Sequence, residues 1–252
     1  DVPTAHGFLA AGCAPEDAWD YCIIGCNELG IPGRSMESST SRHGLVQHLA
    51  ILNQALLEHP TPDSIVNMDE LMACVEARLR QRLRTSRERG EAHRHSVAEG
   101  APMPFTSALM HGCVESGKDF NIGMPYLFPG LYERGLTNAA NALAAIETLV
   151  FREQRLTIGE LLEGMRGNFE NTRLREQLLA APKWGNDDDR VDRWAQALVG
   201  MRERVLDDID EEFGHPAHFV CHVVRSLHHT DGWHIAASPD GRLNGTPVCD
   251  SI

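Results

Sequence analysis

Segments with helical hydrophobic spacing alternate with short apolar runs along this 252-residue chain, and the alternation limits the folds it can adopt. The apolar runs at residues 21–25 and 219–224 are too short for helices and contain β-branched residues, which indicates strands or buried turns. Such a helix-rich chain with scattered short strands belongs to the α/β class. Helices are predicted over residues 14–21, 43–58, 67–99, 105–114, 138–151, from 157 onward and 192–213.

Local signals refine this reading of the chain. Asn67 or Asp69 can cap the long helix, whose core face would include Leu71, Val75, Leu79 and Leu83. The charged far end of that helix, residues 84–95, is predicted to be solvated. Thr157 and Glu160 form a capping box. Glycine, proline and polar residues predict loops or turns at 28–34, 112–130, 182–189 and 238–242.

Charge and hydropathy exclude several kinds of partner. The net charge is −13, from 36 acidic against 23 basic residues. We therefore expect no nucleic-acid partner and no binding to anionic membranes, because both require a basic face. No run approaches the ~20 apolar residues of a membrane span. The chain begins without Met or a signal-peptide pattern, so we expect it to lie inside a longer protein.

Cysteine usage favours a reduced compartment. The seven cysteines are an odd number in a large chain, which predicts a cytoplasmic protein rather than a disulfide framework. No CxxC pair is present to support a structural zinc site. The histidines of residues 218–234 lack metal-ligand spacing, so no metal is expected there. The acids at 187–189 could bind a divalent cation, but they precede a helix, where capping is the simpler explanation.

Five segments, taken in order, resemble the glycyl radical enzyme superfamily, which includes pyruvate formate-lyase, glycerol and diol dehydratases, and choline trimethylamine-lyase. The first ends in Gly-Cys-Asn-Glu at residues 25–28, similar to the Gly-Cys-x-Glu finger loop of that family. The family's usual Gly-Cys-Val-Glu-Pro reads Gly-Cys-Asn-Glu-Leu here, which affects the expected substrate. The matching segments are residues 16–28, 112–126, 138–169, 181–192 and 237–242.

The resemblance implies that residues 1–252 are a single, partial catalytic domain, part of a ten-stranded α/β barrel. It places Cys26 on a loop that enters the centre of the barrel. The family stores its radical on a glycine in an Arg-Val-x-Gly-aromatic motif, which this sequence lacks. We therefore expect the glycyl radical domain, the rest of the barrel and the action of a radical S-adenosylmethionine activating enzyme to lie outside this chain. The chain alone should bind no cofactor and be inert.

The same resemblance assigns two catalytic residues. Cys26 would carry a thiyl radical that takes a hydrogen atom from a small organic substrate, and Glu28 would act as general base. Elimination of the dehydratase or C–N lyase type is then favoured, with an arylacetate-type decarboxylase or a non-catalytic subunit as alternatives. A homodimer is one candidate assembly.

Simpler explanations exist for the cysteines of both Gly-Cys-x-Glu stretches. Without the resemblance, Cys26 would be interpreted as a small buried hydrophobic residue, which is the usual place of a free cysteine. A second Gly-Cys-x-Glu occurs at residues 112–115, but it leads directly into the Gly-Lys-Asp segment, which follows the finger loop at a distance in the family. We therefore expect Cys113 to be a packed or site-lining residue.

Overall fold

The computed structural model describes residues 2–24, 28–35, 44–214, 218–222 and 227–249. The chain divides into two compact units, each built from three segments. The first unit comprises residues 1–46, 82–133 and 206–222, and the second comprises residues 47–81, 134–205 and 223–252. The expectation of one partial catalytic domain stays a prediction.

The first unit begins with two short helices and a hairpin. Helix α1 spans Val2–Ala10 and α2 spans Pro15–Ala18. Sequence patterning missed α1 and made α2 too long. Strands β1 (Cys22–Ile24) and β2 (Glu28–Gly30) then pair antiparallel. The apolar run is therefore a strand. The prediction of a loop over 28–34 is wrong for its first three residues, because Glu28–Gly30 pairs with β1.

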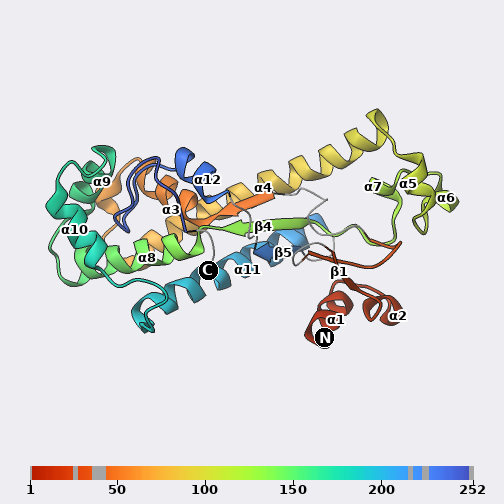
Figure 1. Cartoon of the computed structure of the whole chain (residues 1–252), viewed down its shortest axis with the longest axis horizontal. Coiled ribbons are helices and arrows are strands. Elements are labelled where there is room, and N and C mark those ends of the chain that lie inside the picture. The colour runs from red at the N-terminus through yellow and green to blue at the C-terminus, as the bar shows by residue number, and fades with distance from the viewer. Residues whose placement is uncertain (1, 25–27, 36–43, 215–217, 223–226, 250–252) are drawn as a thin grey trace. The chain divides into compact units, whose positions relative to one another are not determined.

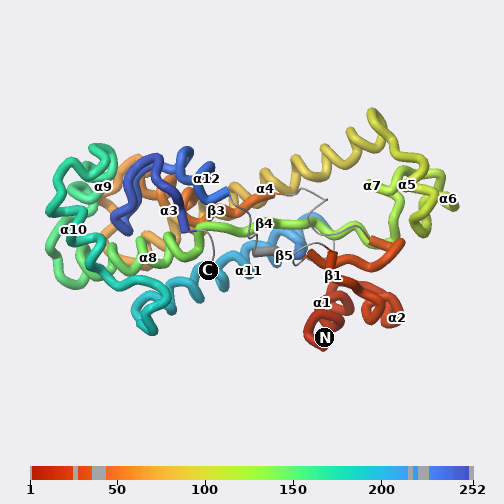
Figure 2. Tube along the Cα trace, in the orientation of Figure 1, coloured from red at the N-terminus to blue at the C-terminus, as the bar shows by residue number. Residues whose placement is uncertain are grey.

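A three-stranded sheet has the order β3-β4-β5 (Figures 1 and 2). Its strands are β3 (Gly44–Gln47), β4 (Gly130–Arg134) and β5 (Phe219–His222). Strands β4 and β5 run parallel, with Gly130 opposite Phe219. The strand predicted at 219–224 is confirmed over 219–222, and residues 223–224 lie outside the described residues. The helix predicted from residue 43 begins later, because residues 44–47 form β3.

Helix α4 (Met68–Gly100) confirms the predicted long helix and its cap. The Asn67 side chain accepts a hydrogen bond from the Glu70 N–H at 2.9 Å. All four predicted core positions, from Leu71 to Leu83, are buried. The prediction of a solvated far end is wrong at two positions, because Arg87 is 1% exposed and Arg94 is buried as well.

The segment after α4 differs most from the sequence prediction. Three short helices, α5 (Pro104–Ala108), α6 (Cys113–Ser116) and α7 (Phe120–Gly123), replace the expected buried helix 105–114 and part of the expected loop 112–130. Phe105 is 79% exposed. Gly112, at φ +78°, stands between α5 and α6, where a continuous helix is not possible.

The second unit is built mainly from helices. Helix α8 (Leu136–Ile146) packs on α3 (His48–Leu57) and continues as a π-helical turn, Glu147–Arg152 (Figure 2). The buried face predicted for 138–151 is confirmed, and so is the Thr157–Glu160 capping box. The remaining helices are the 3-10 helix Pro62–Ser64, α9 (Ile158–Arg166), α10 (Thr172–Ala180), α11 (Asp189–Phe213, which ends in the first unit) and α12 (His228–His234).

A buried polar network holds the C-terminal segment of the second unit. Asp240 accepts hydrogen bonds from the Asn138 amide and the Ser238 hydroxyl, both at 2.6 Å. The Asn138 oxygen accepts from the Cys249 N–H at 2.7 Å. Gly241, at φ +89°, completes the turn predicted at 238–242. Two of the segments that resemble the glycyl radical enzymes thus meet in a structural role.

Candidate functional site

The β1–β2 hairpin carries the predicted catalytic residues. Ile24 lies opposite Glu28 in the antiparallel pairing, so the two strands bracket residues 25–27. Glu28 is half-buried and is the first residue of β2. Cys26 lies outside the described residues. Two antiparallel strands on either side of residues 25–27 are what a finger loop requires, since they bring the chain out and back.

An aromatic cluster supports the base of the hairpin. The rings of Phe8, Phe128 and Phe219 meet with centroids 4.6–5.6 Å apart. Ile31, directly after β2, is fully buried in the same cluster. Aromatic pairs at these separations contribute beyond the area they bury. The cluster therefore ties α1, the hairpin and strand β5 into one core.

Three polar residues meet beside this cluster. The Arg34 Nε lies 2.8 Å from one Asp17 carboxylate oxygen. The Tyr126 hydroxyl donates to the other oxygen at 2.7 Å and accepts from the Ala14 N–H at 3.1 Å. The Ala14 bond lowers the pKa of Tyr126, but burial and the Asp17 carboxylate raise it, and the net direction is upward. Sequence reasoning missed this grouping, because nothing local in the sequence pairs these three positions.

Two described thiols of the first unit, those of Cys13 and Cys113, have raised pKa values and are therefore not poised as nucleophiles. Burial, and then the charge of Asp17, raise the pKa of the Cys13 thiol to about 11. Cys113 is buried at the first position of α6, not on a hairpin, and burial raises the pKa of its thiol. It packs with Phe120 and Met124 and also lines a cavity of about 370 Å³. The expectation that Cys113 is packed or lines a site is therefore confirmed.

The acidic run at 187–189 leads into helix α11. Asp188 accepts from the Arg190 N–H at 3.0 Å and pairs with its guanidinium, which lowers the pKa of the carboxyl. This geometry supports the capping explanation. Within the described part of the chain, no three His, Cys, Asp or Glu side chains converge to hold a metal ion.

A buried charge cluster in the first unit was also missed. The Arg87 guanidinium lies 3.6 Å from Asp210 and 3.4 Å from Glu91. Asp210 accepts from the His218 N–H at 2.8 Å, and its other oxygen lies 2.5 Å from the His218 ring. Burial is the main reason why the pKa of Arg87 is lowered. In sequence, Arg87 is indistinguishable from its exposed arginine neighbours on α4.

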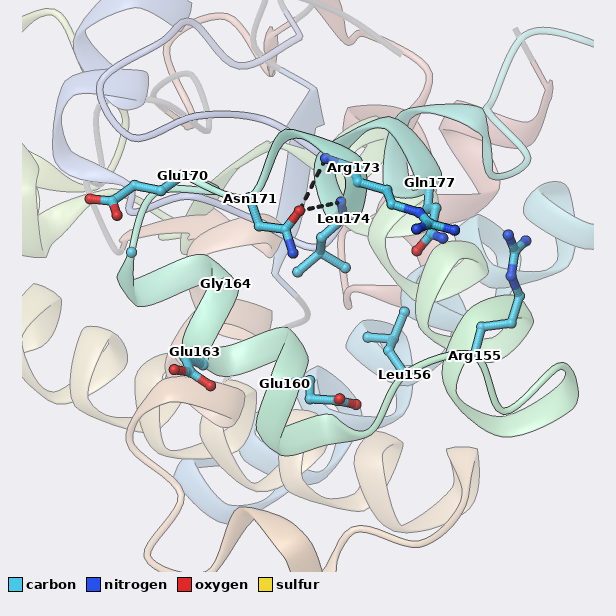
Figure 3. A pocket seen from close by; sticks show the side chains of 11 residues that line it. Arg155, Leu156, Glu160, Glu163, Gly164, Glu170, Asn171, Arg173, Leu174 and Gln177 are labelled. Carbon is cyan, nitrogen blue, oxygen red and sulfur yellow. Dashed lines mark hydrogen bonds between the residues drawn. The ribbon is translucent and has the colours of Figure 1, made fainter.

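A cavity of about 540 Å³ opens between α9 and α10 in the second unit (Figure 3). Glu160 and Glu163 line it from α9, and Arg173 and Gln177 from α10. The side-chain oxygen of Asn171, which also lines the cavity, is already used, because it accepts from the N–H groups of Arg173 and Leu174. These side chains cap and flank helices, and they do not form a catalytic set.

The comparisons with known proteins decide the family. A family model described as pyruvate formate lyase-like matches residues 2–219. The chain belongs to the pyruvate formate lyase-like family. The predicted resemblance to glycyl radical enzymes is thereby confirmed.

Members of the family with known names support this assignment. The chain is 28% identical to the (2S)-3-sulfopropanediol dehydratase of Klebsiella oxytoca, over 76% of the chain and 25% of that protein. It is 26% identical to the isethionate sulfite-lyase of Oleidesulfovibrio alaskensis, over 96% of the chain and 31% of that protein. The chain therefore spans between a quarter and a third of the length of these relatives.

Solved structures of the family confirm the fold. The glycerol-bound B12-independent glycerol dehydratase of Clostridium butyricum matches with a TM-score of 0.82 and 26% identity, over 98% of this chain and 33% of that one. A glycyl radical enzyme of Archaeoglobus fulgidus, 21% identical, shows the same fold with a TM-score of 0.81. The predicted helix-rich α/β fold of this barrel family is confirmed. Among the described helices, none is long and apolar enough to cross a membrane.

Proposed function

We propose that the protein to which this chain contributes is a glycyl radical lyase that removes a leaving group from a small organic substrate. The observation that carries the proposal is the β1–β2 hairpin. Its strands lie on either side of the stretch that contains Cys26, and its second strand begins at Glu28. The relatives support it, since their names describe dehydratases and a sulfite-lyase. The enzyme would be cytoplasmic and activated by a radical S-adenosylmethionine enzyme.

The proposed chemistry assigns separate steps to Cys26 and Glu28. The glycyl radical, expected elsewhere in the protein, supplies the oxidising equivalent that makes Cys26 a thiyl radical. Cys26 then takes a hydrogen atom, so that its S–H bond forms as a substrate C–H bond breaks. The Glu28 carboxylate accepts the proton of a group on the radical carbon while the leaving group departs with its electron pair. Cys26 finally returns its hydrogen atom to the product radical.

Replacing Glu28 by Gln separates the two steps in the full-length, activated protein. Gln keeps size and hydrogen bonding but cannot accept a proton. We expect product formation to fall by ~10²–10⁴, the usual value of general-base catalysis. Deuterium exchange between labelled substrate and Cys26 should persist. The matched control is Glu115→Gln, in the second Gly-Cys-x-Glu stretch, which should leave product formation unchanged.

Three results would count against the proposal. Equal losses of exchange and product in Glu28→Gln would mean that Glu28 only braces the hairpin. Full activity of that variant together with release of carbon dioxide would favour a decarboxylase, and an indoleacetate decarboxylase of Tractidigestivibacter scatoligenes is among the relatives, 28% identical over 60% of this chain. No turnover in the complete, radical-bearing protein would favour a non-catalytic subunit.

A further inference from the structure

We propose that Asp17, Arg34 and Tyr126 form a clamp that positions the β1–β2 hairpin, and with it Cys26, for hydrogen-atom transfer. The inference rests on the proposed function, which it deepens by adding positioning residues. Asp17 lies in α2, just before β1, and Arg34 lies just after β2. Tyr126 comes from a distant part of the first unit.

The clamp is a closed cycle of interactions. Asp17 binds the Arg34 side chain with one oxygen and the Tyr126 hydroxyl with the other. The cycle closes through the backbone, because the Tyr126 N–H donates to the Arg34 carbonyl at 3.2 Å. The side chain of Asp17 is only 11% exposed, so these charge-assisted bonds are partly shielded from water. The two ends of the hairpin are thereby fixed to each other and to a third segment.

The hairpin needs such an anchor because its own pairing is short. Each strand has three residues, and an isolated two-stranded hairpin is marginally stable. Ile23, in the middle of β1, is 65% exposed and adds little packing within this chain. Hydrogen-atom transfer depends strongly on position, and a displacement of ~1 Å can lower a rate by ~10²-fold. The clamp acts at the base of the hairpin, where a small tilt moves the tip most.

Tyr126→Phe tests the clamp by removing one hydroxyl and two hydrogen bonds. The matched control is Tyr132→Phe, the same change on β4 and outside the cycle. In the full-length protein, hydrogen–deuterium exchange of the β1 and β2 amides should become about tenfold faster in Tyr126→Phe, corresponding to ~1.4 kcal/mol. Exchange in α8 of the second unit should not change. The control should behave as the wild type at both places.

A second pair of variants tests the ion pair. Arg34→Met should loosen the hairpin as Tyr126→Phe does, and Arg34→Lys should restore part of the protection, because an ammonium keeps the charge opposite Asp17. In the activated protein, both loosened variants should lower kcat about tenfold or more while KM stays within about twofold, since the clamp positions Cys26 and does not touch substrate.

The outcomes separate the clamp from the proposed function. Unchanged exchange of the hairpin amides in both Tyr126→Phe and Arg34→Met would overturn the clamp. Faster exchange with unaltered kcat would overturn its positioning role. If the hairpin amides exchange faster in the two variants but the activated wild-type protein shows no turnover, the proposed lyase function is refuted and the clamp on the hairpin stands.

Discussion

Replacing Arg242 by Lys should destabilise the second unit far more than an Arg-to-Lys change usually does. The Arg242 guanidinium is buried and donates to the Ser238 hydroxyl and to four backbone carbonyls, those of Ile235, Ala236, Leu243 and Thr246. An ammonium has three donors, so at least two of these five bonds must be lost. Hydrogen bonds to charged groups contribute ~1.5–3 kcal/mol each, which gives a loss of about 3–6 kcal/mol.

Urea denaturation measures this loss. The free energy of unfolding would be obtained from far-UV circular dichroism and from tryptophan fluorescence, since three of the four tryptophans, Trp184, Trp194 and Trp233, belong to the same unit. Arg166→Lys is the control, because Arg166 is exposed on α9 and should change stability by less than about 0.5 kcal/mol. A loss below about 1 kcal/mol in Arg242→Lys would refute the bond-by-bond reasoning.

Three further predictions concern Cys13 and Arg87 of the first unit. Iodoacetamide at pH 9 should modify Cys22 and Cys74 well before Cys13, because the pKa of Cys13 is raised from 9.0 to about 11; mass spectrometry showing Cys13 modified as fast would contradict this. Since the fold favours the neutral thiol, the contribution of Cys13 to stability is full below pH 9 and is lost as the pH rises through about 11. Arg87→Met should lower the free energy of unfolding by about 3–5 kcal/mol, because it removes the buried guanidinium that faces the buried Asp210 carboxylate; denaturation of Arg84→Met, which removes an exposed arginine of the same helix, is the comparison.

Sequence patterning predicted the elements whose signals are local. The buried face of α4, the face of α8 and the Thr157–Glu160 capping box all follow from residue spacing within one segment. Sequence patterning failed where the pairing of strands decides the structure. Strand β3 was predicted as helix, because a run of four residues has no distinctive period and only the sheet selects the extended form.

The candidate site shows the same division. The apolar run predicted strand β1, and the Gly-Cys-x-Glu resemblance predicted a finger loop after it, but strand β2 was not predicted, because residues 28–34 have the glycine and proline content of a loop. The clamp did not, because Asp17 and Tyr126 are 109 positions apart and neither is unusual in its own segment. Arg87 was predicted to be solvated for a related reason, since its burial depends on Asp210 at the end of α11.

The most direct test of the proposed function compares two serine variants of the full-length, activated protein. Cys26→Ser should abolish turnover while the glycine-centred doublet in the electron paramagnetic resonance spectrum persists, because a serine O–H bond is too strong to act as the hydrogen donor. Cys113→Ser should retain substantial activity, because Cys113 is packed in α6. Turnover by Cys26→Ser, or loss of turnover in Cys113→Ser alone, would contradict the assignment of Cys26 as the radical carrier.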